Sequence, residues 1–175
     1  LSILNTSIPA AEIVEMLMNA QDFAEKNDPE ESGIRILFYG RSGTGKTELA
    51  RYIAEKLNKK ICLKRASDIF EPYVGQSEQN IAQAFAEAEL SGDILLFDEA
   101  DSFFSDRQNA VHSWERTLVN EFLTQMEEFN GILICTTNLR RIMDPAMQRR
   151  FHILTEFKPL TKEGLEKLFT RFFPA

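Results

Sequence analysis

The sequence lacks the features of a secreted, membrane-spanning or disulfide-stabilised protein. No apolar run approaches the roughly 18 residues that a membrane-spanning helix needs, and no signal peptide is present. Only two cysteines occur, Cys62 and Cys135, and both lie in short apolar runs. They fit small buried hydrophobic residues better than a redox pair or a metal site. We therefore expect a cytoplasmic protein with no membrane segment.

Basic residues are also comparatively few. Lys and Arg total 20 against 27 Asp and Glu, which gives a formal net charge of −7. Nucleic-acid surfaces usually show a basic face, so this balance argues against a nucleic-acid partner without excluding a local basic patch. The 175 residues suffice for one domain with a full core. Because the chain begins at Leu1 and stops just after a helical pattern, we interpret it as a piece of a longer protein.

What the sequence does have is an alternation of short apolar runs with helical patterns. Strands are expected at 34–39, 60–64, 93–97, 131–136 and 153–157. Helices are expected at 10–26, 48–57, 77–90, 111–129 and 161–173, with a connection at 66–70 and a short helical turn at 144–150. We expect Ser77 and Thr161 to cap the helices that follow them. The alternation predicts an α/β fold, in which a parallel sheet carries helices on both faces.

The most informative stretch reads G-x-x-x-x-G-K-T, from Gly40 to Thr47. It lies between an expected buried strand and an expected helix, which is the context that a phosphate-binding loop requires. Glycines let the backbone curl so that its N–H groups face an anion, and the helix N-terminus adds its dipole. Lys46 can reach the β- and γ-phosphates of a nucleotide, and the Thr47 hydroxyl can ligate Mg²⁺. The expected nucleotide contacts are Gly40, Ser42, Gly43, Thr44, Gly45, Lys46, Thr47 and Glu48.

Two further strands end in polar residues. Asp98 and Glu99 follow the third apolar strand, and Asn138 follows the fourth. Ligands of parallel α/β sheets bind at the carboxyl ends of the strands, so these residues and the glycine loop are expected at one edge. Asp98 can hold Mg²⁺, and Glu99 can deprotonate a water that attacks the γ-phosphate. Asn138 can hold that water or a phosphate oxygen, although a turn-forming Asn is an equal alternative.

Arg149 and Arg150 come shortly after Asn138 in the sequence. Paired arginines on a domain surface are usually solvated. Their position past the fourth strand favours a different interpretation, an arginine finger that stabilises charge in the transition state of phosphoryl transfer.

Together these segments resemble the ATPase module of the AAA+ superfamily, close to the AAA subgroup that remodels proteins. The matching segments are GRSGTGKT (40–47), ILLFDEAD (94–101), CTTN (135–138) and DPAMQRRF (144–151). They are similar, in that order, to the family's Walker A, Walker B, sensor 1 and arginine-finger segments. The resemblance implies a P-loop NTPase fold of three α/β/α layers, with a five-stranded parallel sheet of order 5-1-4-3-2.

The family's roles carry over to matching positions. The resemblance implies ATP/ADP and Mg²⁺ as cofactors, Lys46 and Thr47 on phosphates and metal, and Asp98 on the metal through water. It implies Glu99 as catalytic base, Asn138 as sensor, and Arg149 and Arg150 acting on the nucleotide of a neighbouring subunit in a homo-oligomeric ring, usually a hexamer.

Two departures from the family pattern stand out. Many members carry Pro-Gly before the last finger arginine, whereas this chain has Gln148-Arg149-Arg150-Phe151, a shorter form that resembles microtubule-severing and membrane-remodelling relatives. Which arginine dominates is left open. The lid is also shortened: residues 1–158 correspond to the large ATPase subdomain, with an N-terminal helix and linker at 1–33, and 159–175 to the first helix of a truncated lid.

Tyr73-Val74-Gly75, ahead of Ser77-Glu78, resembles the family's central pore loop. In the family the aromatic residue of this triplet grips an extended polypeptide inside the ring. A tyrosine offers a flat apolar face, and Gly75 gives the loop freedom. The alternative is a turn whose tyrosine covers the edge of the core. The pore interpretation implies a protein or peptide substrate.

These features favour an ATP-driven protein remodeller. A nucleic-acid motor or loader on the same core would need a basic stripe, and most lysines are scattered along the chain. A P-loop kinase would need an acceptor site and would leave Asn138 and the two arginines unexplained.

Overall fold

A computed structural model describes residues 3–26, 33–69, 75–104, 113–138 and 145–172. The strands are β1 (Ile34–Gly40), β2 (Ile61–Arg65), β3 (Ile94–Asp98), β4 (Ile132–Thr137) and β5 (Ile153–Phe157). The long helices are α1 (Ala10–Lys26), α2 (Lys46–Lys56), α4 (Gln76–Ser91), α6 (Ser113–Glu128) and α8 (Lys162–Phe172). Three four-residue helices complete this part of the chain: α3 (Ala66–Ile69), α5 (Asp101–Phe104) and α7 (Pro145–Gln148).

The five strands form one sheet in the order β2-β3-β4-β1-β5, and neighbouring strands are parallel. This is the order that the resemblance implied, read from the other edge. The central strands β3 and β4 are buried along almost their whole length, because helices cover both faces of the sheet. All five strands therefore deliver their carboxyl ends to one edge, where the residues directly after β3 and β4 meet the loop that follows β1.

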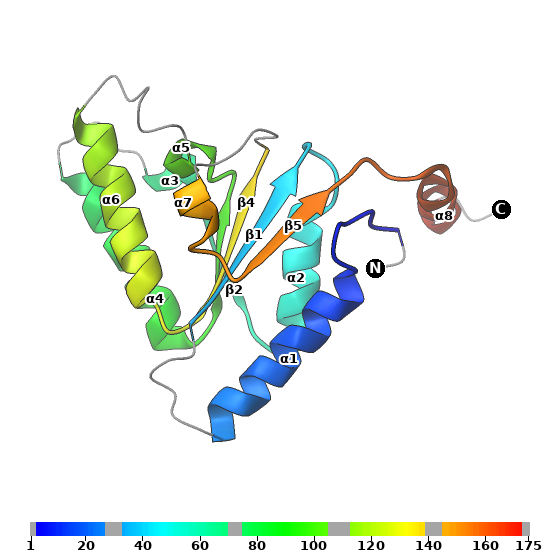
Figure 1. Ribbon diagram of the computed structural model, residues 1–175, viewed down its shortest axis with the longest axis horizontal. Coiled ribbons are helices and arrows are strands. Elements are labelled where there is room, and N and C mark those ends of the chain that lie inside the picture. The colour runs from blue at the N-terminus through cyan, green and yellow to red at the C-terminus, as the bar shows by residue number, and fades with distance from the viewer. Residues whose placement is uncertain (1–2, 27–32, 70–74, 105–112, 139–144, 173–175) are drawn as a thin grey trace.

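Helices pack on the two faces of the sheet in separate layers (Figure 1). The side chains of α1 and α2 bury one apolar cluster against the sheet, and those of α4, α5 and α6 bury the other. Phenylalanines dominate the second cluster. Phe103 and Phe122 stack with ring centroids 4.5 Å apart, and Phe97 meets Phe122 edge to face at 5.1 Å. Such contacts add to the burial term and fix α5 beneath the end of β3.

The N-terminal segment runs along the outer edge of β5. Thr6 forms an antiparallel bridge with Phe157, Ser7 N donates to Glu156 O at 2.9 Å, and Lys158 N donates to Asn5 O at 2.8 Å. These bonds occupy backbone groups that an edge strand would otherwise leave open. Figure 1 shows α8 set apart from the sheet, near this N-terminal segment.

Most expected elements are confirmed within one or two residues, two short helices were not foreseen, and one capping prediction was wrong. The expected connection at 66–70 contains α3, and α5 was not foreseen. The N-cap of α4 is Gly75, with φ of 83°, and not Ser77, whose buried side chain lies in the first turn. The capping role of Thr161 is confirmed, since its Oγ1 accepts from Gly164 N at 3.1 Å.

No helix in the described ranges is long and apolar enough to cross a membrane. Within the same ranges, both cysteines are free. Cys135 is buried and Cys62 is half-buried, as expected of small hydrophobic residues.

Candidate nucleotide-binding site

The glycine loop joins β1 to α2 in the conformation that its sequence demands. Gly40 has φ of 143°, and a Cβ there would lie 2.1 Å from Phe157 O, so no other residue fits. Gly45 has φ of 96° and caps α2 without a side-chain hydrogen bond. The first N–H groups of α2 therefore face the loop with no side-chain acceptor, and together with the helix dipole they favour an anion there. Thr44 Oγ1 donates to Arg41 O at 2.7 Å and closes the loop.

Lys46 is buried at the start of α2, and its ammonium points back into the loop. Its Nζ donates to Gly40 O, Arg41 O and Asn138 Oδ1, each at 2.9 Å. Burial lowers the pKa of Lys46, and nearby carboxylates oppose that shift. The arrangement holds a cation at the point where the loop meets the end of β4.

Thr47 and Asp98 come together beside the loop. Thr47 Oγ1 donates to Asp98 Oδ1 at 3.0 Å, and Thr136 Oγ1 donates to the same oxygen at 2.6 Å. Among the described residues, no group of three or more Asp, Glu, His or Cys side chains could hold a metal by itself. Mg²⁺ is usually bound by one or two carboxylates together with phosphates and water. One hydroxyl and one carboxylate beside a phosphate loop therefore fit Mg²⁺ bound with a nucleotide.

Glu99 follows Asp98 in a sharp turn and is exposed. Its φ of 57° is left-handed, which costs a non-glycine residue about 1–2 kcal/mol. Its backbone N–H donates to Thr136 Oγ1 at 3.0 Å, so β4 holds the turn in place. Non-glycine residues in this region often lie at functional sites. The turn separates the two adjacent carboxylates, leaving Asp98 beside Thr47 and Glu99 facing solvent.

Asp101 belongs to the site and was not foreseen as a functional residue. Its Oδ1 accepts hydrogen bonds from Thr137 Oγ1 and from Asn138 N, the latter at 2.9 Å. The only signal in the sequence was a third carboxylate shortly after Asp98 and Glu99.

Arg149 and Arg150 lie away from this edge. The Arg35 guanidinium donates from Nε to Arg150 O at 2.8 Å. Arg35 is near the start of β1, whereas Lys46 lies beyond its end, so the arginines occupy the opposite edge of the sheet. Arg150 forms an ion pair with Glu127 of α6, and Arg149 is exposed. The role of the two arginines at a neighbouring subunit's nucleotide stays a prediction.

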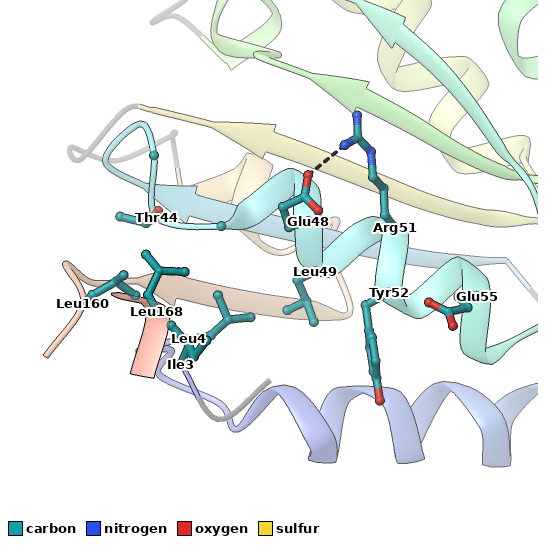
Figure 2. A pocket seen from close by; sticks show the side chains of 12 residues that line it. Ile3, Leu4, Thr44, Glu48, Leu49, Arg51, Tyr52, Glu55, Leu160 and Leu168 are labelled. Carbon is teal, nitrogen blue, oxygen red and sulfur yellow. Dashed lines mark hydrogen bonds and ion pairs between the residues drawn. The ribbon is translucent and has the colours of Figure 1, made fainter. Parts of the chain in front are cut away.

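A cavity of about 610 Å³ opens beside the phosphate loop. Leu4 from the N-terminal segment, Leu160 from the connection to α8 and Leu168 from α8 form its apolar wall (Figure 2). Glu48 and Tyr52 line it from α2, and Glu48 accepts a hydrogen bond from Arg51 at 2.7 Å. Sequence reasoning missed the apolar wall, because it forms only when distant segments fold together. It identified Glu48 from the motif alone.

Of the expected pore triplet, Tyr73 and Val74 lie outside the described residues. Gly75 is described, and its left-handed backbone starts α4. A Cβ added at Gly75 would meet nothing within 4 Å, so conformation rather than packing favours glycine there.

Comparison with known proteins identifies the family of the chain. Residues 36–159 match the family model described as "ATPase family associated with various cellular activities (AAA)". The chain belongs to the AAA family. The match spans every strand except the start of β1, and it includes the phosphate loop, Asp98, Glu99, Asn138 and both arginines.

Several curated relatives are similar to this AAA module. Protein SAV of Sulfolobus acidocaldarius is 33% identical over 162 residues, which cover 87% of this chain and 20% of that protein. Protein CdcH of Halobacterium salinarum is 33% identical over 141 residues, 76% of this chain and 19% of that protein. A Corynebacterium glutamicum protein named "AAA ATPase forming ring-shaped complexes" is 32% identical over 157 residues, 78% of this chain and 30% of that protein. The chain thus spans less than a third of the length of each of these relatives.

The fold also matches a solved structure. One chain of the E. coli MS115-1 HORMA:CdnC:Trip13 complex aligns with a TM-score of 0.71, covering 95% of this chain and 67% of that chain. At 23% identity this likeness establishes the fold alone.

Proposed function

We propose that this chain binds ATP with Mg²⁺ and hydrolyses it. The observation that carries the proposal is the convergence of Lys46, Thr47, Asp98, Glu99 and Asn138 at one edge of the sheet, from three separate strand ends. Phosphoryl transfer depends mainly on positioning and charge stabilisation, and this edge supplies a cation, a carboxylate, an exposed base and a neutral amide.

In the proposed reaction the backbone N–H groups of the loop and the Lys46 ammonium hold the β- and γ-phosphates. Glu99 accepts a proton from a water that attacks the γ-phosphorus, and the bond to the β–γ bridging oxygen breaks to release ADP and phosphate. Asn138 holds the water or a γ-phosphate oxygen without adding negative charge. Thr47 and Asp98 would hold Mg²⁺, which neutralises charge on the phosphates when it is bound.

We place the base and ribose of the nucleotide in the cavity beside the loop. The cavity begins at Gly45 and Thr44, next to the proposed phosphate position, and its far wall is apolar. An apolar pocket with a few polar groups is typical of small-molecule sites. A Cβ at Gly45 would lie 2.5 Å from Leu4 Cδ2, so the N-terminal segment packs directly on the loop.

We further propose that the protein works as a cytoplasmic homo-oligomeric ring, a hexamer by analogy with the family, that remodels a protein or peptide substrate. Arg149 and Arg150 lie at the edge opposite the phosphate loop, so they could serve only a nucleotide held by a neighbouring copy. One relative is named as forming ring-shaped complexes, which supports this arrangement. Residues 1–158 would form the large ATPase subdomain, and 159–175 the first helix of a lid.

The test of ATP binding compares Lys46→Ala with Lys60→Ala. Lys60 is an exposed lysine ahead of β2 and serves as the control. Lys46→Ala removes the charge that meets the phosphates, so a fluorescent ATP analogue should no longer bind, while Lys60→Ala binds normally. Affinity of Lys46→Ala within about threefold of wild type, a change under 1 kcal/mol, contradicts the proposal.

The test of hydrolysis compares Glu99→Gln with Glu89→Gln, an exposed position on α4. Glu99→Gln keeps the shape of the side chain but loses the base, so it should bind ATP and release no phosphate. Glu89→Gln should turn over normally. Near wild-type turnover by Glu99→Gln in the assembled protein rules out Glu99 as the base.

A further inference from the structure

Asp101 connects the end of β4 to the segment that follows β3. Pairing between β1 and β4 ends at Tyr39 and Thr137. The first N–H beyond β4, that of Asn138, donates to Asp101 Oδ1 at 2.9 Å, and the buried Thr137 hydroxyl donates to the same oxygen. Asp101 thus fixes the backbone of Asn138 directly after the last residue of β4 that is paired with β1.

The side chain of Asn138 is held from the other direction. Its Oδ1 accepts the hydrogen bond from Lys46 Nζ at 2.9 Å. Backbone and side chain are therefore fixed by two oppositely charged groups, Asp101 and Lys46. A hydrogen bond from a backbone N–H to a carboxylate is shorter and stronger than one between neutral groups.

Helix capping does not account for this carboxylate. Asp101 is the first residue of α5, and the turn closes through Phe103 N, which donates to Ala100 O at 3.0 Å. The bonds described for the Asp101 carboxylate go to β4 instead. Ala100 N also donates to Thr136 O at 2.8 Å, so Ala100 and Asp101 are both hydrogen-bonded to residues at the end of β4.

We propose that Asp101 is a positioning residue for Asn138. By fixing the Asn138 backbone and the Thr137 hydroxyl, it sets the direction in which the Asn138 amide meets the γ-phosphate or the attacking water. The inference rests on the proposed function of Asn138 in ATP hydrolysis. Asp101 touches neither nucleotide nor water in this role and acts through its neighbour.

The experiment is a double-mutant cycle between Asp101→Ala and Asn138→Ala in the assembled protein. ATP turnover gives kcat and KM, and a fluorescent ADP analogue gives an affinity that does not depend on the γ-phosphate. Asp101→Ala should lower kcat at least tenfold with KM and ADP affinity changed less than threefold. In the Asn138→Ala background it should change kcat less than twofold, because the group it positions is already gone.

Conservative variants separate positioning from folding. Asp101→Asn retains an oxygen acceptor and should recover most of the turnover that Asp101→Ala loses. Thr137→Ser retains the hydroxyl and should exceed Thr137→Val in turnover. The inference is overturned if the fold-losses in kcat of Asp101→Ala and Asn138→Ala multiply in the double variant. It is also overturned if Asp101→Ala loses ADP affinity in parallel with a fall in melting temperature.

The proposed role of Asn138 and the inferred role of Asp101 can be contradicted separately. If Asn138→Ala leaves kcat unchanged, the proposed role of Asn138 is wrong and the inference about Asp101 falls with it. If Asn138→Ala lowers kcat and Asp101→Ala does not, only the inference is overturned.

Discussion

The ammonium nitrogen of Lys46 lies 2.9 Å from the side-chain oxygen of Asn138, which is 92 positions further along the chain. The contact joins the start of α2, just after the loop that follows β1, to the end of β4. Strands β1 and β4 are neighbours in the sheet. Any group that binds Lys46 from the loop side must therefore share the lysine with Asn138 or take its place. The Asn138 amide and the Lys46 ammonium form one hydrogen-bonded unit.

Asn138→Asp tests whether the neutrality of this amide matters. The new carboxylate would pair with Lys46 and would face the γ-phosphate. Like charges 4–8 Å apart repel by about 2–4 kcal/mol at an effective dielectric constant of about 20. We expect ATP affinity to fall at least tenfold and ADP affinity to fall less, because ADP lacks the γ-phosphate. Calorimetric titration of both nucleotides measures the two values, with Asn138→Ala as the uncharged control. An equal loss for ATP and ADP would show that Asn138 does not face the γ-phosphate.

Arg149 and Arg150 should differ when each is changed to Ala. The Arg150 side chain forms an ion pair with Glu127, and its backbone carbonyl accepts a hydrogen bond from Arg35, whereas Arg149 is exposed. We expect Arg149→Ala to leave the melting temperature unchanged and to depress turnover in the assembled protein, since a finger in trans can contribute about 10³-fold. Arg150→Ala should also lower the melting temperature by a few degrees. Glu127→Gln is the matched control for that stability effect.

Mixing experiments test whether the arginines act across an interface. Subunits that lack both Arg149 and Arg150 are combined with Glu99→Gln subunits, and turnover is measured after exchange. Some mixed interfaces then regain a working base and a working arginine, so activity should reappear. Mixed rings that form and stay inactive would contradict action in trans.

His152 should make stability depend on pH. Arg35 N donates to His152 Nδ1 at 3.1 Å, and the Arg35 guanidinium lies 3.1 Å from Nε2. Burial, and then the positive charge of Arg35, lower the pKa of His152. The unfolded chain, with a histidine pKa of about 6.5, binds the proton more readily than the folded chain. The contribution of His152 is therefore complete above that pKa and is lost as pH falls through it toward the lower folded value.

Urea denaturation at about pH 7.5 and 5.5 measures this contribution, within a window that stays above the carboxylate pKa values near 4. The free energy of unfolding should be lower at the acidic pH. His152→Gln should reduce the difference, while His112→Gln, which changes the other histidine, should leave it intact. Equal pH dependence in wild type and His152→Gln would show that His152 is not responsible.

The sequence predicted the elements and residues that local patterns determine. A loop with glycines at 40 and 45 before a lysine has few physical alternatives, since a Cβ at either position meets another segment. Apolar strands that end at Asp98 and Asn138 must share an edge once the sheet is parallel. Each of these signals is contained in a few consecutive residues, so it could be read without a structure.

Long-range contacts could not be read in this way. Asp101 finds its partners on β4, 36 and 37 positions away, and nothing in its own neighbourhood distinguishes it from a solvated acid. The apolar wall of the cavity joins Leu4 to Leu160 and Leu168 across the whole chain. The wrong N-cap prediction for α4 has a local cause. Ser77 is a residue type that favours the N-cap position, but Gly75, with its left-handed backbone, occupies that position two residues earlier.

The last prediction concerns Tyr73, the residue that would convert ATP turnover into work on a polypeptide. The hypothesis rests on the Tyr-Val-Gly triplet and on its last residue, Gly75, whose left-handed backbone caps α4. Tyr73→Ala should leave the melting temperature, nucleotide binding and basal turnover nearly unchanged, and it should abolish remodelling of a polypeptide in the assembled protein. Tyr73→Phe should be mild, because the aromatic face and not the hydroxyl makes the contact.

Tyr39 supplies the matched control, because it packs against the core on β1. Removing a buried aromatic side chain costs roughly 3–5 kcal/mol, and a half-buried one somewhat less. Tyr39→Ala should therefore lower the melting temperature clearly while Tyr73→Ala does not. If Tyr73→Ala melts as early as Tyr39→Ala and loses nucleotide binding in parallel, Tyr73 belongs to the scaffold. The hypothesis that a ring threads a polypeptide would then lose its strongest support in this chain.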